Sequence, residues 1–207
     1  MIWTLSLEII MKKITKLACV SFIIGGVFAS SVMAAPVPEN PKHQTPQGLY
    51  VTAKEAAEMM RKDPSVILVD VRTPEEWQFV GHTGVAQIMV PSITFDYSAI
   101  DTKKPRYKPV PNANFISELE ERAADLDADE ESTYILMCRS GSSRSQPAAK
   151  LMDQYGYENV YIMVDGFEGK KTKTGDKKGF RLENGWKNSG EPWTYDITET
   201  NVYFVEE

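Results

Sequence analysis

Residues 134–144 read Tyr134-Ile135-Leu136-Met137-Cys138-Arg139-Ser140-Gly141-Ser142-Ser143-Arg144. This stretch decides the fold, because its first four residues form the continuous apolar run of a strand buried on both faces of a sheet. A helical pattern follows from Gln146 to Tyr155 and is closed by Gly156. Cys138 therefore falls between a buried strand and a helix, at the carboxyl edge of a predicted parallel sheet, where open α/β sheets bind ligands.

The rest of the chain repeats this alternation of strand and helix. Apolar runs predict three further strands, at 66–69, 85–90 and 160–163. Cap residues predict three further helices, which begin after Thr52, Thr73 and Asn114. The last of these helices has an apolar face made of Phe115, Ile116, Leu119, Ala123 and Leu126. The predicted fold class is α/β, with a central parallel sheet and helices on both faces.

Two stretches interrupt the alternation. Residues 92–113 form a long, turn-rich insertion that contains three prolines, and residues 170–179 contain five lysines among polar residues. Both are predicted to be exposed surface excursions, although loops of this length often carry function.

The N-terminus has the pattern of a secretory signal peptide. A basic segment at 11–16 precedes an apolar stretch of 16 residues at 17–32, and Val32-Met33-Ala34 fits the small-residue cleavage pattern. We therefore predict a signal peptide at 1–34, with Met11 as an alternative start, and a periplasmic location. A retained membrane anchor is the other interpretation, since the apolar stretch is only slightly shorter than a spanning helix.

The remaining chain divides into a proline-rich linker at 35–48, one domain at 49–195 and a C-terminal tail at 196–207. Cleavage after Ala34 leaves 20 basic and 28 acidic residues, a net charge of −8. This charge argues against a nucleic-acid partner or an anionic membrane surface. Cleavage also removes Cys19, so that Cys138 is the single thiol of the mature chain and no internal disulfide is possible.

The segment after Cys138 predicts an activated thiol. Its glycine and serines allow backbone N–H groups to turn inward as an anion cradle, and the following helix adds positive potential. A thiol in this position should ionise below its free pKa of about 8.5 and act as a nucleophile. The alternative is a small, buried structural cysteine. We predict Cys138 as the catalytic residue and the following loop residues as the substrate-binding set: Arg139, Ser140, Gly141, Ser142, Ser143 and Arg144.

Several motifs together resemble the rhodanese family over residues 48–193. They are Asp70-Val71-Arg72, Pro74-Glu75-Glu76-Trp77, Gly81-His82, the Cys138 loop, Asp165-Gly166-Phe167, Asn184-Gly185-Trp186 and Pro192-Trp193. The resemblance implies a thiosulfate-type sulfurtransferase that forms a persulfide on Cys138 and needs neither metal nor organic cofactor. It implies as partners a small anionic sulfur donor and a thiol or cyanide acceptor, or a protein that accepts the sulfur.

Asp70 and Arg72 are predicted to support the site, because they follow a strand end on the same edge. Asp70 would orient the cysteine loop or Arg72, and a structural salt bridge or cap explains it equally well. His82 is interpreted as a packing residue. No cluster of residues has metal-ligand spacing, since Cys138, His43 and His82 are isolated in the sequence.

The loop departs from the family in length. It has one residue more between Cys138 and Arg144 than single-domain rhodaneses of this kind usually have. The length resembles that of cell-cycle dual-specificity phosphatases and eukaryotic-type arsenate reductases, which usually carry histidine where this chain has Met137. An oxyanion-handling phosphatase or arsenate reductase is therefore one alternative function. Another is a non-catalytic sulfur carrier that docks a partner through 92–113 or the lysine-rich segment.

Overall fold

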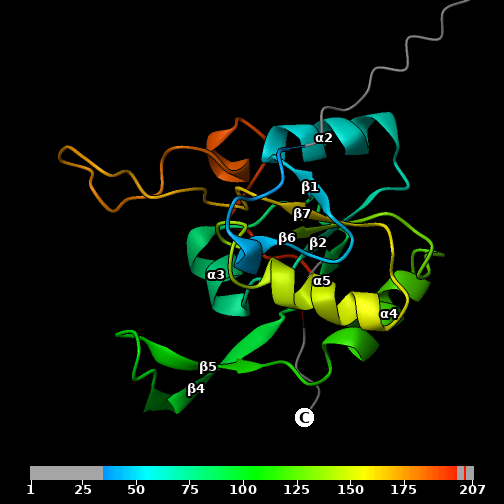
Figure 1. Cartoon of the computed structure of the whole chain (residues 1–207), viewed down its shortest axis with the longest axis horizontal. Helices are drawn as coiled ribbons and strands as arrows, with labels where there is room; N and C mark the ends of the chain where they lie inside the picture. Colours follow the sequence, from blue (N-terminus) through cyan, green and yellow to red (C-terminus); the bar gives the residue numbers. More distant parts are fainter. Residues whose placement is uncertain (1–34, 200–202, 204–207) are drawn as a thin grey trace, which may run out of the picture. The chain divides into compact units, whose positions relative to one another are not determined.

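The computed structural model describes residues 35–199 and 203. Five parallel strands form one sheet in the order β1-β7-β6-β2-β3 (Figure 1). Their bounds are β1 (Leu49–Val51), β2 (Ile67–Asp70), β3 (Ile88–Met89), β6 (Tyr134–Met137) and β7 (Val160–Met163). The prediction of an α/β fold with a central parallel sheet is confirmed.

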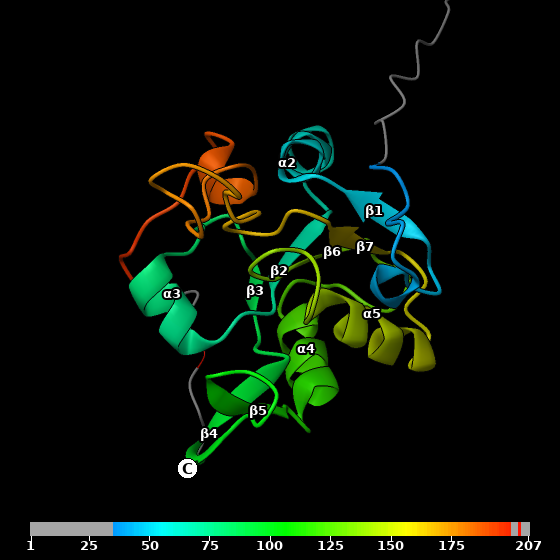
Figure 2. The same ribbon diagram turned by 60° about the vertical axis from the view of Figure 1, so that its left-hand side comes forward.

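Helices cover both faces of this sheet. Figure 2 shows α4 (Phe115–Ala124) and α5 (Ser145–Gln154) together on one side, while α2 (Ala53–Lys62) and α3 (Pro74–Val80) lie on the other. Each side has its own cluster of buried apolar side chains. The predicted signal peptide lies outside the described residues. Within the described residues, no helix has the length and apolar character needed to cross a bilayer.

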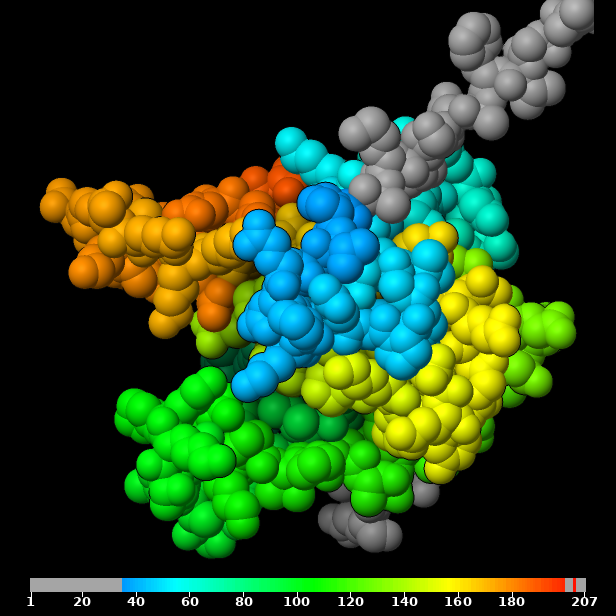
Figure 3. Space-filling view, viewed as in Figure 1, coloured from blue at the N-terminus to red at the C-terminus, as the bar shows by residue number. Residues whose placement is uncertain are grey.

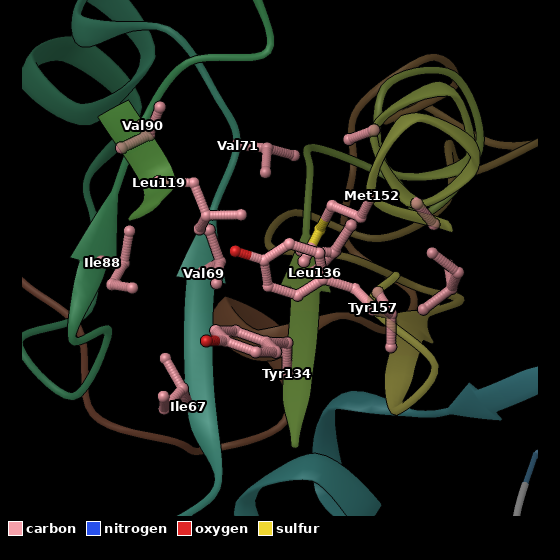
Figure 4. Packing of buried hydrophobic residues seen from close by; sticks show 14 of the residues in the cluster. Ile67, Val69, Val71, Ile88, Val90, Leu119, Tyr134, Leu136, Met152 and Tyr157 are labelled. Atoms are coloured by element: carbon pink, nitrogen blue, oxygen red, sulfur yellow. The ribbon is translucent and has the colours of Figure 1, made fainter. Parts of the chain in front are cut away.

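The apolar run of β6 is continuous because its side chains serve both clusters in alternation. Tyr134, Leu136 and Cys138 belong to the cluster under α4 and α5, and Ile135 and Met137 belong to the cluster under α2 and α3. In Figure 4, Tyr134 and Leu136 lie among the side chains of the first cluster. The ring of Tyr134 packs edge-on against that of Tyr157, with 5.4 Å between centroids. A polar side chain at any position of this strand would be buried away from water, on one face of the sheet or the other.

The strand predicted at 85–90 is much shorter than expected, because β3 contains two residues. The chain turns first, with the Ala86 N–H donating to the Thr83 carbonyl. Next, the Gln87 side chain occupies the edge of β2, accepting from the Leu68 N–H at 2.9 Å and donating to the Val66 carbonyl. The side-chain amide of Gln87 therefore takes the place of backbone hydrogen bonds between β3 and β2. Val85, at the start of the predicted strand, is exposed.

The helix predicted after Asn114 begins there, but Asn114 does not cap it through its side chain. The Asn112 side chain instead accepts the Asn114 N–H at 3.0 Å and donates to Glu118. Four of the five predicted face residues are buried. Leu126 is exposed, because it follows the end of the helix at Ala124.

The insertion at 92–113 is not an irregular loop. It forms an antiparallel hairpin of β4 (Ile93–Ile100) and β5 (Tyr107–Pro111) that constitutes a separate two-stranded sheet. The Tyr97 and Tyr107 rings pack edge to face at 5.1 Å, and the Tyr97 hydroxyl donates to Glu75 on α3.

The two short 3₁₀ helices are η1 (Pro41–His43) and η2 (Trp186–Asn188). The described part of the predicted linker contacts the domain: the Ala35 N–H donates to the Tyr50 carbonyl, and the Gln47 side chain donates to the Ala149 carbonyl.

The sheet topology fixes where a site can form. From β2 the chain moves outward to β3, whereas from the adjacent β6 it moves the other way, to β7. The two connections α3 and α5 cover opposite faces, so the carboxyl ends of β2 and β6 border an opening between them. Cys138 follows β6, and Arg72 follows β2, at this point.

Candidate active site

The Cys138 side chain lies in the turn between β6 and α5 and is fully buried. Burial by itself raises the pKa of its thiol. The charge of Arg144, the Ser145 hydroxyl and N–H, and the Ser140 N–H oppose this effect and lower the pKa to about 7. The Ser145 hydroxyl is buried and makes no hydrogen bond within the described residues, so its proton is free to turn to a Cys138 thiolate. The turn therefore holds a thiol that is substantially ionised near neutral pH.

Arg144 closes the turn and is itself held by a carboxylate. Its guanidinium makes two hydrogen bonds to Glu76 on α3, one of them at 2.8 Å, and both side chains are largely buried. Burial alone would raise the pKa of Glu76, but the hydrogen bond and charge of Arg144, with a further contribution from Arg72, lower it on balance. Glu76 also accepts the Thr73 N–H at the start of α3. One carboxylate thus links the cysteine loop to the neighbouring helix.

Two glycines allow the loop to lie against the segment after β7. Gly141 has φ +69°, and a Cβ there would come within 2.2 Å of the Val164 backbone. Gly166 has φ +62°, and a Cβ there would come within 2.4 Å of the Cys138 carbonyl oxygen and 2.7 Å of the Ser140 nitrogen. The Phe167 N–H then donates to the Cys138 carbonyl at 2.8 Å. Only glycine fits at these two positions.

The predicted supporting pair, Asp70 and Arg72, is fully buried beside the loop. Arg72 makes a two-pronged interaction with Asp70, with Nη2 to Oδ2 at 2.7 Å, and also donates to the Gly81 carbonyl. Its guanidinium stacks on the Phe167 ring at 3.8 Å from the centroid. Both carboxylate oxygens of Asp70 bind Arg72. Arg72 in turn contacts Phe167, whose N–H donates to the Cys138 carbonyl, so the pair is connected to the loop through Phe167.

The other predicted loop residues face outward to different degrees. Arg139 is half exposed and pairs with Glu168, while Ser140 and Ser142 are partly exposed with their hydroxyls 3.3 Å apart. Ser143 is exposed. His82 is a buried packing residue, with Nε2 2.9 Å from the Asp196 carbonyl oxygen.

A cavity of about 440 Å³ adjoins the loop at Ser143 and Arg144. Its other walls are mostly apolar and come from the hairpin base (Ile93 and Pro111), from α4 (Phe115) and from α5 (Leu151). The insertion at 92–113 thus forms part of the surroundings of the cysteine loop.

A comparison with known families agrees with this geometry. The rhodanese-like domain family matches residues 52–173, more than half of the chain. The chain belongs to this family. A rhodanese-like fold was predicted from the motifs, and that prediction is confirmed.

Relatives and solved structures extend the comparison. The uncharacterized protein RC0915 of Rickettsia conorii is 29% identical over 145 residues, which are 70% of this chain and 96% of the relative. The crystal structure of Rv0390 from M. tuberculosis has a TM-score of 0.53 at 30% identity, covering 71% of this rhodanese-like chain and 97% of its own. The solution structure of a polysulfide-sulfur transferase homodimer from Wolinella succinogenes has a TM-score of 0.40 at 18% identity. The match covers 60% of this chain and 70% of the Wolinella chain.

Three residues in or next to the site were not predicted as part of it. Glu76 was recognised as a helix cap, but nothing in the sequence relates it to Arg144, 68 positions away. Ser145 directly follows the predicted loop, and the preference for hydroxyl groups near a thiolate could have identified it. Arg181 lies in the polar segment after β7, where the five lysines were the more visible basic residues.

The acidity of Cys138 can be tested at Ser145. Replacing Ser145 with alanine removes a hydroxyl that stabilises the thiolate, so the pKa of Cys138 should rise by about 0.5–1 unit. The measurement is the pH dependence of the alkylation rate by iodoacetamide, whose midpoint is expected at about pH 7 in the wild type and at higher pH in S145A. S143A, which changes an exposed hydroxyl in the same loop, should leave the midpoint in place. Equal midpoints in wild type and S145A would contradict this role.

The close approach at Gly166 gives a second prediction. In G166A the new methyl group must displace the backbone of the cysteine loop, so we expect more than about 2 kcal/mol of destabilisation and slower alkylation of Cys138. G175A is the matched control, because Gly175 also has a positive φ but open space around it, and should cost about 1 kcal/mol. Urea unfolding measures both variants. Equal losses would show that backbone strain, not contact with the loop, accounts for the effect.

Proposed function

We propose that this rhodanese-like chain is a periplasmic sulfurtransferase that forms a persulfide on Cys138. The donor is thiosulfate or a similar sulfane-sulfur compound, and the acceptor is a thiol or cyanide. One observation carries the proposal: a buried thiol whose pKa is lowered to about 7 by Arg144, Ser145 and a backbone N–H cradle. Such a thiol needs no separate general base, because about half of it is ionised at pH 7.

Sulfur transfer then proceeds in two displacements. The Cys138 thiolate attacks the sulfane sulfur of thiosulfate, a new S–S bond forms, and the bond to the sulfonate sulfur breaks with its electron pair leaving on sulfite. The resulting persulfide anion occupies the same cradle, where the Ser140 and Ser145 N–H groups and Arg144 stabilise its charge. An acceptor such as cyanide attacks the outer sulfur, and thiocyanate leaves while the Cys138 thiolate is restored.

The length of the loop favours a second candidate, an oxyanion-handling phosphatase or arsenate reductase. Sulfur transfer fits the contacts better for two reasons. Glu76 already accepts two of the five N–H groups of Arg144 and offsets its charge, which weakens the hold of this guanidinium on a dianionic tetrahedral oxyanion. Asp70, the carboxyl group at the end of β2, is bound to Arg72 and is not placed to protonate a leaving group.

Incubation of the mature protein with thiosulfate tests the chemistry. Mass spectrometry of the intact chain should show the addition of one sulfur atom, lost again on treatment with cyanide, and C138S should show no addition. Aryl phosphate should not be hydrolysed above the C138S background. An intact, unmodified Cys138 thiol after incubation would rule out the proposed activity. Phosphate release that depends on Cys138 would favour the second candidate.

The export part of the proposal rests on residues 11–34, which precede the described chain. Expression of the full sequence in a Gram-negative host should deliver the protein to the periplasmic fraction with Ala35 as its first residue. N-terminal sequencing of the fractionated protein provides the measurement. An uncleaved protein in the membrane fraction would support the retained anchor instead.

A further inference from the structure

The segment after β7 forms an irregular hairpin. Lys171 and Arg181 pair as an antiparallel bridge, and the Thr172 N–H donates to the Phe180 carbonyl at 2.8 Å. Residues 173–180 beyond this base are exposed. The family match ends at residue 173, so most of the hairpin lies outside the part of the chain that the family describes.

This hairpin and the β4–β5 hairpin extend beside the carboxyl edge of the sheet. In Figures 1 and 2 the yellow-green turn after β6 lies between the orange segment and the green hairpin. Figure 3 shows both standing out from one face of the molecule, with the surface hollowed between them.

A short chain of contacts connects Arg181 to the cysteine loop. The Glu168 N–H donates to the Arg139 carbonyl at 2.9 Å, next to the Phe167 contact with Cys138. The Glu168 carboxylate pairs with the Arg139 side chain. The Arg181 guanidinium donates through Nη1 to the carbonyl of Gly169, the next residue along. Arg139 and Arg181 are therefore both held by the 168–169 segment that lies against the loop.

The Arg181 guanidinium has unused binding capacity. Its Nε is buried and has no hydrogen-bond partner within residues 35–199 and 203, an arrangement that costs free energy unless a ligand supplies an acceptor. Burial and the charge of Arg139 lower the pKa of Arg181, while the charges of Glu168, Cys138 and Glu76 oppose this. The thiolate and both arginines therefore lie within electrostatic reach of one another. Glu168 forms its ion pair with Arg139, and no ion pair to Arg181 occurs among the described residues, which leaves an excess of positive charge at this point.

We propose that Arg139 and Arg181 form the subsite for the sulfonate end of the sulfur donor, and that Arg181 determines the preference for such donors. This rests on the proposed sulfurtransferase function. Attack of the Cys138 thiolate on thiosulfate brings a monoanion to a dianion, and the repulsion must be offset by fixed positive charge. The planar guanidinium fork suits a sulfonate, and it continues to bind as sulfite departs with both negative charges.

The first test compares three variants with the wild type in single-turnover loading by thiosulfate. R181Q should raise the half-saturating thiosulfate concentration about tenfold, with little change in the rate at saturation. R181K should be intermediate, because it keeps the charge and loses the fork. K177Q removes the same charge from the exposed part of the hairpin and should differ from the wild type by less than about twofold.

A second measurement is independent of sulfur transfer. Cys138 is alkylated with iodoacetate, an anion, and with iodoacetamide, which is neutral. In R181Q the ratio of the two rates should fall about fivefold, while the iodoacetamide rate, measured well above pH 7 where the thiol is ionised in both proteins, stays the same. K177Q should preserve the ratio.

The two measurements separate the possible failures. Wild-type protein that takes up no sulfur from thiosulfate contradicts the proposed function. Normal loading of the wild type, together with an R181Q variant that matches it both in half-saturating concentration and in the alkylation ratio, overturns the role of Arg181.

Discussion

The ion pair between Arg144 and Glu76 joins the two halves of the site, and much of the local structure depends on it. Glu76 belongs to the first turn of α3, where it also accepts the Thr73 N–H, while Arg144 ends the cysteine loop. Both side chains are largely buried, so removing either one would leave an unpaired charge at a cost of roughly several kcal/mol. The same guanidinium lowers the pKa of Cys138. A single contact therefore anchors the loop, completes the start of a helix and helps keep the nucleophile ionised.

Next to this ion pair, the structure allows the buried Cys138 thiol to ionise. A fully buried thiol would ordinarily be harder to ionise than one in water. Here the loop supplies N–H groups and a hydroxyl at short range, and Gly141 and Gly166 let the neighbouring backbone approach closely enough to hold the loop in that shape. Asp70 and Arg72 form a second buried pair that meets the loop through Phe167. Arg139 pairs with Glu168 next to the loop, and Arg181 binds the Gly169 carbonyl beside it.

The two excursions from the domain contribute to these surroundings in different ways. The β4–β5 hairpin provides apolar walls to the cavity beside Ser143, and the 170–182 hairpin brings Arg181 toward Arg139. The prolines of the first sequence and the lysines of the second indicated exposure correctly and gave no sign of where each excursion would pack. The five lysines suggested that the second excursion carries charge, yet its one arginine at the base is the residue held near the thiol.

The sequence by itself determined the α/β class, the order of the main strands and helices, and the position of Cys138 between a strand and a helix. These features follow from local patterns: apolar runs such as 134–137, capping boxes such as Thr52 with Glu55, and glycine after a helix. It predicted a longer β3 than the molecule has, because Gln87 uses its side chain to bind the edge of β2. Only the tertiary structure decided which residues surround the thiol. Glu76 and Gly166 contact the loop across long separations in the chain, and Arg181 contacts Gly169 beside it. Contacts of that kind depend on how strands and helices pack rather than on any pattern within a segment.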